Sequence, residues 1–360
     1  MSILDDVEKI RAIDPGNMYN CIFDLPEQIA EALQIGRKWQ FDAGDFADVK
    51  NIVVIGMGGS AIGGDLVRSY LSSRLLTPIQ ICRHYQLPEY VDDETLVIAS
   101  SYSGNTEETL SAVNDALNRK SMIAAISTGG LLNDVAKLND IPFALLPPGL
   151  QPRAALGYSM VPVLVFLERI NLISDVTDDI NAVVSRLQEF RENYIEDLPT
   201  KVNLAKQLAE KLHGRIPIIY SGPTLTDAVG LRWKGQICEN SKTLAFVNQF
   251  AEFNHNELVG WSDPVKTHAE HLVVVMLRDA DDHPQIRKRM NLVQEIIEKQ
   301  QVPVIEVHSK GEHPLQRMFY LIQLGDFTSY YLATLNEVDP TPVEVIEFLK
   351  KMLAEKKMVV

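Results

Sequence analysis

The chain has 360 residues, of which 46% are hydrophobic and 23% charged, and its 34 basic and 48 acidic side chains give a net charge of −14. The length fits two or three domains or one large α/β unit, and the composition is that of a globular protein, which excludes wholesale disorder. The acidic balance argues against binding nucleic acid or an anionic membrane through the overall charge, so any anion site must be local.

The cysteines and the apolar stretches favour a cytoplasmic protein. The three cysteines lie far apart and form no CxxC pair, which is typical of reduced thiols. The acidic N-terminus lacks the apolar core of a signal peptide, and the most apolar stretch, 160–167, is too short to span a bilayer. We therefore expect a cytoplasmic protein with neither a nucleic acid nor a membrane as partner.

The first half of the chain predicts strands that alternate with helices. Its first forty residues are typical of helical segments interrupted by a turn at 14–17. After them, each apolar run leads into a polar or glycine-rich loop. The predicted strands of this half are 52–55, 79–82, 95–100 and 122–126. This alternation predicts a parallel sheet with helices on both faces.

The second half repeats the pattern after a polar, helical connecting region. Its predicted strands are 216–220, 272–277 and 302–307. We therefore predict an α/β fold with two doubly wound parallel-sheet domains, a helical N-terminus and a C-terminal helix. The expected parts are an N-terminal helical segment (1–40), a first domain (41–175), a connecting helical region (176–212) and a second domain with the C-terminal helix (213–360).

The loop after the first strand is rich in glycine. Gly56-x-Gly58-x-x-Ala61 matches the fingerprint of a dinucleotide-binding loop. The second strand, however, ends in Arg83-His84 and lacks the carboxylate that holds the ribose of a nicotinamide cofactor, although Arg83 suits a 2′-phosphate. The glycines could also serve only a tight turn. We favour a small phosphorylated ligand over both alternatives.

The loop at 100–109 places several hydroxyl groups between a strand and the start of a helix. Asn105 with Glu108 three residues later is typical of a capping box at that helix start. The first-turn N–H groups and the helix dipole favour an anion, and Ser101, Ser103 and Thr106 can add neutral donors. Simple capping is the alternative reading. Three hydroxyls around a glycine lead us to predict a phosphate site.

These loops resemble a known family. Gly58-Gly59-Ser60 followed by Ser101-Tyr102-Ser103-Gly104-Asn105-Thr106 resembles the sugar isomerase (SIS) domain. Four further segments are similar to the bifunctional phosphoglucose/phosphomannose isomerase family, and they lie at 151–158, 233–242, 252–257 and 338–343. The similarity extends over nearly the whole chain. It implies that Gly59, Ser60, Ser101, Ser103 and Thr106 bind the substrate phosphate.

The resemblance also implies four catalytic residues. Glu239 is the expected base that moves a proton between C1 and C2 of a sugar, and Arg153 is the expected cation facing the enediolate. His255 is expected to open the hexose ring from the neighbouring subunit of a homodimer. Lys350 is expected to assist ring opening, with the adjacent Lys351 as the alternative. By themselves, the same residues are also compatible with a solvated helix glutamate, a solvated arginine, a structural histidine and helix-end lysines.

The expected function is that of an aldose–ketose isomerase. It would interconvert glucose 6-phosphate and mannose 6-phosphate with fructose 6-phosphate through an enediolate, in glycolysis and gluconeogenesis. No cofactor and no metal are expected, because the proton moves within the substrate and the histidines at 268 and 271 lack the spacing of a zinc motif. Two alternatives remain at this point, a non-catalytic sugar-phosphate sensor and an NADP-dependent oxidoreductase.

Overall fold

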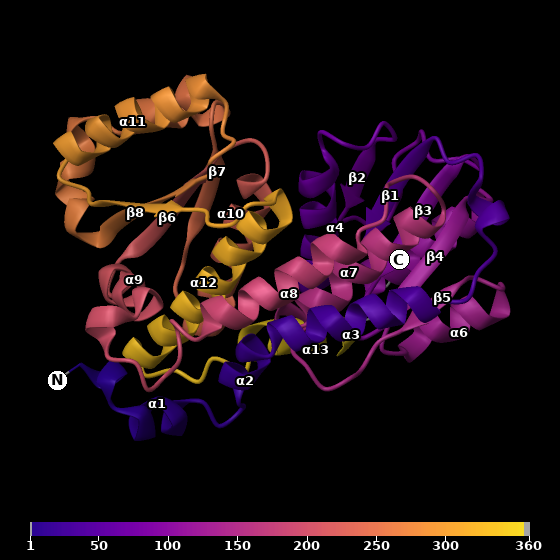
Figure 1. The fold of residues 1–360 in the computed structure, drawn as a ribbon, viewed down its shortest axis with the longest axis horizontal. Coiled ribbons are helices and arrows are strands. Elements are labelled where there is room, and N and C mark those ends of the chain that lie inside the picture. Colours follow the sequence, from indigo (N-terminus) through magenta and orange to yellow (C-terminus); the bar gives the residue numbers. More distant parts are fainter. Residues whose placement is uncertain (1, 356–360) are drawn as a thin grey trace.

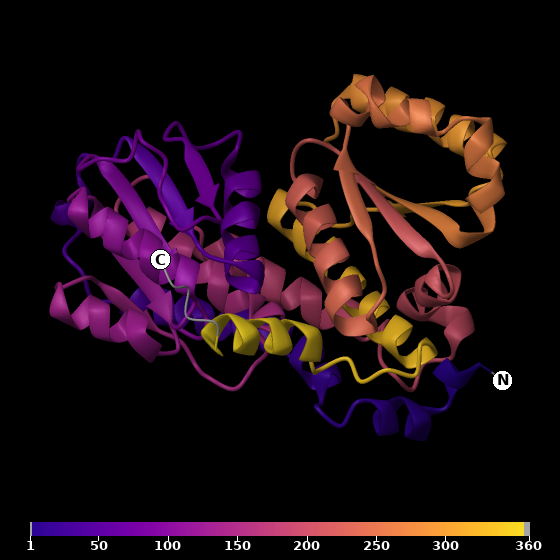
Figure 2. The ribbon, with the colours of Figure 1, turned by 180° about the vertical axis from the view of Figure 1, so that it is seen from behind.

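The structure is a computed structural model that describes residues 2–355. It contains two all-parallel sheets that lie side by side (Figures 1 and 2). The first has the order β2-β1-β3-β4-β5 and the second the order β7-β6-β8-β9. The strands are β1 (Asn51–Ile55), β2 (Ile79–Cys82), β3 (Thr95–Ser100), β4 (Met122–Ser127), β5 (Phe143–Leu145), β6 (Ile216–Ser221), β7 (Phe246–Gln249), β8 (Leu272–Arg278) and β9 (Val304–His308).

Helices cover both sheets, which confirms the predicted α/β fold. The α-helices are α1 (Val7–Ile13), α2 (Met18–Phe23), α3 (Leu25–Lys38), α4 (Gly58–Leu71), α5 (Glu107–Asn118), α6 (Gly130–Leu138), α7 (Leu156–Arg169), α8 (Thr177–Arg191), α9 (Leu204–Leu212), α10 (Thr226–Ser241), α11 (Pro284–Lys299), α12 (Pro314–Leu335) and α13 (Glu344–Glu355). The 3₁₀ helices used below are η3 (Pro152–Ala154) and η5 (Glu252–His255). None of the helices in residues 2–355 has the length and apolar character needed to cross a membrane.

The central strands form because their residues are apolar on both faces. β1 and β3 pair in parallel with Val53 opposite Val97, and nearly all their side chains are buried. Two short edge strands, β5 and β7, were not predicted from the sequence. Leu145 and Phe246 in these strands are more than half exposed, so the strands lack the continuous apolar run of a buried parallel strand.

The connecting region at 176–212 forms α8 and α9, which pack against the long helix α12. α8 also packs against α3 of the N-terminal segment, and α3 lies along α7. In Figure 1 the helices directly between the two sheets are α4 and α10, which contact each other. The division into four parts stays a prediction, and residues 1 and 356–360 of its outer ranges lie outside the described part of the chain.

Helices α10 and α12, both in the second half of the chain, pack closely against each other. Trp233 of α10 is fully buried and donates through Nε1 to the carbonyl of Leu321, 2.8 Å away. Gly325 of α12 lies against the same indole, and a Cβ built there would be 2.7 Å from Cδ1 of Trp233. Beside this contact, the buried Arg232 pairs with Asp326 at 2.6 Å. The absence of a side chain at Gly325 therefore sets the distance between the two helices.

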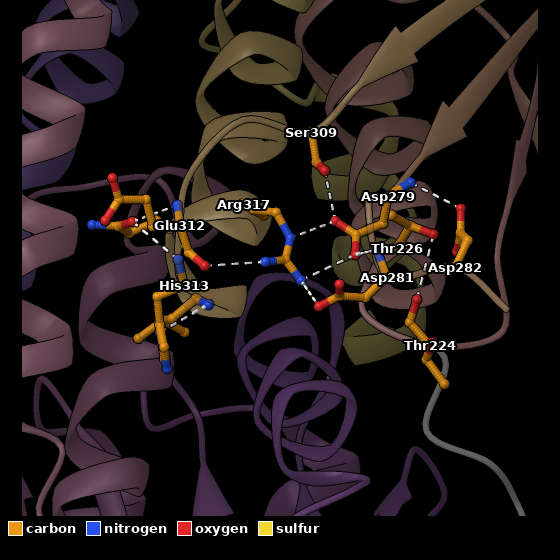
Figure 3. Close-up of polar contacts among 11 residues, drawn as sticks. Thr224, Thr226, Asp279, Asp281, Asp282, Ser309, Glu312, His313 and Arg317 are labelled. Atoms are coloured by element: carbon orange, nitrogen blue, oxygen red, sulfur yellow. Dashed lines mark hydrogen bonds and ion pairs between the residues drawn. The ribbon is translucent and has the colours of Figure 1, made fainter.

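The loops at the carboxyl end of the second sheet are joined by an internal ion-pair network (Figure 3). The buried Arg317 of α12 bonds to both carboxylate oxygens of Asp279, at 2.9 and 3.2 Å, and also pairs with Asp281. Ser309 donates to the same Asp279 carboxylate at 2.6 Å. Asp282 accepts from the backbone N–H of Asp279 at 2.8 Å, but its second oxygen is buried without a hydrogen-bond partner. Burial raises the pKa of Asp282 to about 6.

We predict that Gly325→Ala destabilises the protein by about 1–3 kcal/mol, because the added methyl group overpacks the contact with Trp233. Denaturant unfolding of the purified variant measures this loss. The matched control is Gly235→Ala on α10, where a Cβ would meet no atom within 4 Å and which should gain up to about 1 kcal/mol from helix propensity. Equal stability of the two variants would contradict the packing argument.

We predict that Asp282→Asn stabilises the protein at about pH 8 by about 1–3 kcal/mol and changes little at about pH 4. The folded-state pKa of Asp282 is raised above its ordinary value of 3.8, so ionisation costs stability as the pH rises from 3.8 to about 6 and above. The asparagine removes that cost. Unfolding midpoints across this pH range test the effect, with the exposed Asp93→Asn as the control; a stabilisation independent of pH would contradict it.

Candidate active site

The side chain of Arg153 lies at the centre of the candidate site. It belongs to η3, is only 3% exposed, and reaches α10 and the segment before α13. Its Nε donates to Oδ1 of Asn240 at 2.6 Å, and its Nη1 lies 3.5 Å from Oε2 of Glu239. Its Nη2 donates to the carbonyls of Pro340 and Thr341 at 2.6 and 2.9 Å. The guanidinium is thus held on three sides, as a buried charge requires.

Helix α10 directs Glu239 toward this guanidinium. One face of α10 is buried, because its residues recur every three or four positions along the helix. This face carries Trp233, Gln236, Ile237 and Asn240. Glu239 lies off that buried face, and its side chain keeps 32% of its surface exposed. The catalytic base predicted from the sequence is therefore accessible to a ligand and adjacent to the predicted cation.

A pocket of about 210 Å³ opens between the start of α4 and α10. Its lining includes Gly59 and Ile62 of α4, Arg153 of η3, and Lys234, Gln236 and Glu239 of α10. Arg83 and Arg232 also line the pocket but pair with Asp65 and Asp326, so the remaining lining charges are the cations of Arg153 and Lys234 and the carboxylate of Glu239. The net charge of the chain is negative, but this pocket is locally positive, which suits an anionic ligand.

Gly59 allows η3 to approach the start of α4. A Cβ at this position would be 2.8 Å from the backbone nitrogen of Arg153 and closer still to the carbonyl of Pro152. The glycine therefore lets Arg153 reach the pocket. Arg83, which the sequence left open as a partner of a 2′-phosphate, pairs with the buried Asp65. A 2′-phosphate would therefore have to compete with Asp65 for this guanidinium.

The loop at 100–109, called the hydroxyl loop below, lies directly beside Gly59. Ser60 accepts from the N–H of Tyr102 at 3.0 Å, which joins the start of α4 to the loop. The hydroxyls of Ser101 and Thr106 bond to each other at 2.9 Å, and Ser103 is exposed. Ser101 is buried, so Ser103 and Thr106 are the hydroxyl residues with exposed surface next to the uncapped N-terminus of α5, where backbone N–H groups favour an anion.

The capping box predicted at this helix start is wrong. The N-cap of α5 is Thr106 rather than Asn105, and no side chain caps the helix. The Asn105 carboxamide oxygen accepts from the backbone N–H of Leu131 at 3.0 Å instead, so it joins the hydroxyl loop to α6. A contact with a residue 26 positions away could not be read from local spacing.

The structure does not bring His255 or the C-terminal lysines into this pocket. His255 lies in η5 and is exposed to solvent. Lys350 and Lys351 are exposed on α13, and Lys351 lies 3.9 Å from Glu355. Among the described residues of one chain, the pocket therefore unites Gly59, Arg153 and Glu239 but none of these three groups.

The sequence analysis gave no role to Asn240 or Lys242. Asn240 is fully buried and carries the hydrogen bond that orients Arg153, and its Nδ2 donates to Ser329 at 2.9 Å. Lys242 lies at the end of α10 and bonds to Pro340 at 3.1 Å. Both residues belong to the segment 233–242 that carried the resemblance, but their partners lie about ninety or more residues away in sequence.

Known protein families and curated proteins are similar to most of this chain. A family model for the SIS domain matches residues 45–166, and one for the bacterial phospho-glucose isomerase C-terminal SIS domain matches residues 201–353. The bifunctional phosphoglucose/phosphomannose isomerase of Caldicellulosiruptor bescii is 45% identical over 94% of this chain and 100% of its own length. That of Aquifex aeolicus is 36% identical over 88% of this chain and 94% of its own length.

A solved structure shares the fold. A hypothetical protein from Thermus thermophilus superposes with a TM-score of 0.75 at 17% identity, over 98% of this chain and 94% of its own. The pairing of Arg153 with Glu239, the hydroxyl loop and the full-length similarity to the curated relatives lead to one conclusion. This chain belongs to the bifunctional phosphoglucose/phosphomannose isomerase family and consists of two SIS domains.

Proposed function

We propose that the protein interconverts glucose 6-phosphate and mannose 6-phosphate with fructose 6-phosphate. The observation that carries the proposal is the carboxylate of Glu239 next to the guanidinium of Arg153, 3.5 Å apart and open to the pocket. In the aldose-to-ketose direction, Glu239 accepts the C2 proton and returns it to C1. Arg153 offsets the negative charge of the enediolate between these two transfers. Electrostatic stabilisation of such a developing charge is usually the largest contribution to the rate enhancement.

The substrate phosphate is assigned to the hydroxyl loop. Ser101, Ser103 and Thr106 supply hydroxyls, Gly59 at the start of α4 lines the pocket, and its neighbour Ser60 is hydrogen-bonded to Tyr102 of the loop. The carboxyl end of the second sheet is less suited to an anion. It carries the carboxylates of Asp279 and Asp281, and the one arginine beside them, Arg317, is paired with both. Like charges would repel a phosphate at that position. This asymmetry favours one substrate site per chain.

The protein is further proposed to act as a cytoplasmic homodimer in glycolysis and gluconeogenesis. His255 is assigned to ring opening in the partner's site, because it is exposed and does not line the pocket of its own chain. Lys350 of α13, or its neighbour Lys351, is assigned to the same step. The amphipathic α13 exposes Val345, Phe348 and Leu349 to solvent, which fits a surface that a second subunit covers.

We predict that Glu239→Gln retains the fold and substrate binding but lowers kcat for fructose 6-phosphate by about 10²–10⁴-fold, the typical contribution of a positioned base. A coupled assay that reads both aldose products measures turnover, and solvent-hydrogen exchange at the substrate carbon should stop with it. The exposed Glu295→Gln on α11 is the matched control. A wild-type protein that forms neither aldose would refute the proposed function, whereas an active Glu239→Gln variant would move the base to another residue.

We predict that co-expressed His255→Ala and Glu239→Gln chains recover activity, although each homodimer alone is impaired. A mixed dimer has one site with both an intact glutamate and an intact histidine, so turnover should approach half that of the wild type per dimer. Tagged subunits purified in tandem verify that the heterodimer has formed. No recovery in the verified heterodimer would place His255 in the site of its own chain.

A further inference from the structure

The segment that leads to α13 is held against the candidate site by two cations on one carbonyl. The backbone oxygen of Pro340 accepts from Nη2 of Arg153 at 2.6 Å and from Nζ of Lys242 at 3.1 Å. Arg153 has an assigned role, but Lys242 has none in the function proposed above. Lys242 and Arg153 are therefore connected through the Pro340 carbonyl, to which both donate a hydrogen bond.

Lys242 also closes the end of α10. It is the C-cap of this helix, with a left-handed φ of 54°, a conformation that is uncommon for a residue with a side chain. Its ammonium donates to the carbonyl of Glu239 at 2.8 Å and to that of Asn240 at 3.4 Å. The last carbonyls of a helix have no intrahelical partner, so a lysine at this place satisfies them. The backbone of Glu239 is thereby bonded directly to Lys242.

We propose that Lys242 is a positioning residue for Glu239, and that its ammonium ties the last turn of α10 to the Pro340 carbonyl so that the carboxylate stays beside Arg153. This inference rests on the proposed function, since it concerns the same base. The carboxylate is 3.5 Å from Arg153, and a small shift of the helix end would change that separation. Such a misplacement, by about 1 Å, can cost about 10²-fold in rate.

The turn does not depend on Lys242 alone for its fold. Asn336 donates to the carbonyl of Ser241 at 2.8 Å and to the hydroxyl of Thr243 at 2.9 Å. Arg153 and Asn240 hold the preceding part of the helix independently. A variant at Lys242 should therefore remain folded, and the loss should appear in the geometry of Glu239.

The charge of Lys242 depends on pH in the alkaline range. Burial and the nearby Arg153 guanidinium lower its pKa to about 8, while the carboxylates of Asp339, Glu239 and Glu344 oppose this shift. These groups face it from η3, from the segment before α13, from α10 and from α13 itself. Because the pKa is lowered, the ammonium is present below about pH 8 and lost above it, and a neutral amine makes weaker hydrogen bonds to carbonyls.

The test compares Lys242→Met and Lys242→Arg with Lys288→Met, an exposed lysine on α11. Lys242→Met should lower kcat for fructose 6-phosphate about tenfold or more at neutral pH, with KM changed by less than about twofold. Lys242→Arg should restore most of kcat, because an arginine keeps its charge and its donors at every pH used. The alkaline decline of kcat, expected near pH 8 in the wild type, should move upward in Lys242→Arg.

Two results would overturn the proposal. One is a Lys242→Met variant with kcat equal to that of Lys288→Met. The other is a Lys242→Arg variant whose kcat is lowered as much as in Lys242→Met or whose alkaline decline is unchanged. If Lys242→Met fails to fold, the alkaline decline of Lys242→Arg relative to the wild type still decides the proposal. A wild-type protein without any turnover would instead refute the proposed function, and this result is distinct from the two that overturn the role of Lys242.

Discussion

The buried guanidinium of Arg153 is the group on which the arrangement of the site depends. A charge that is only 3% exposed is stable only when its donors are occupied, and here the acceptors come from two distant parts of the chain. Asn240 and Glu239 lie on α10, and the carbonyls of Pro340 and Thr341 lie on the segment before α13. The guanidinium of Arg153 can therefore be buried with all its hydrogen bonds only when the first domain, α10 and the C-terminal segment have packed together.

The two sheets are both parallel but differ in what their carboxyl ends carry. In the first, the hydroxyls of Ser60, Ser101 and Thr106 gather near the start of two helices, with Ser60 and Ser101 buried and hydrogen-bonded within the loop region. In the second, Asp279 and Asp281 bind Arg317, so the corresponding end is closed by an internal ion pair (Figure 3). The repeated fold thus provides two comparable positions, and among the described residues only the second of them carries this buried Asp–Arg network.

Close approach of backbones is a second constraint, and small residues meet it. Gly59 brings η3 onto α4, and Gly325 brings α12 onto Trp233 of α10. The first contact places the arginine and the second fixes the helix that carries the glutamate. A side chain at either position would change the separation of the elements that bear Arg153 and Glu239, so the close packing at these glycines positions the candidate site.

The amino-acid sequence by itself determined the alternation of strands and helices, the hydroxyl loop, the family and the two residues that meet in the pocket, Glu239 and Arg153. The strands, helices and loop follow from local patterns, and the family and the two residues follow from motifs shared with known proteins. Both can be recognised without knowing which residues contact each other in the folded chain. The tertiary structure alone decided the edge strands β5 and β7, the bond of Asn105 to Leu131, and the pairing of Arg83 with Asp65. It also decided the place of Lys242, because a hydrogen bond to a carbonyl 98 residues away follows from packing and leaves no trace in sequence spacing.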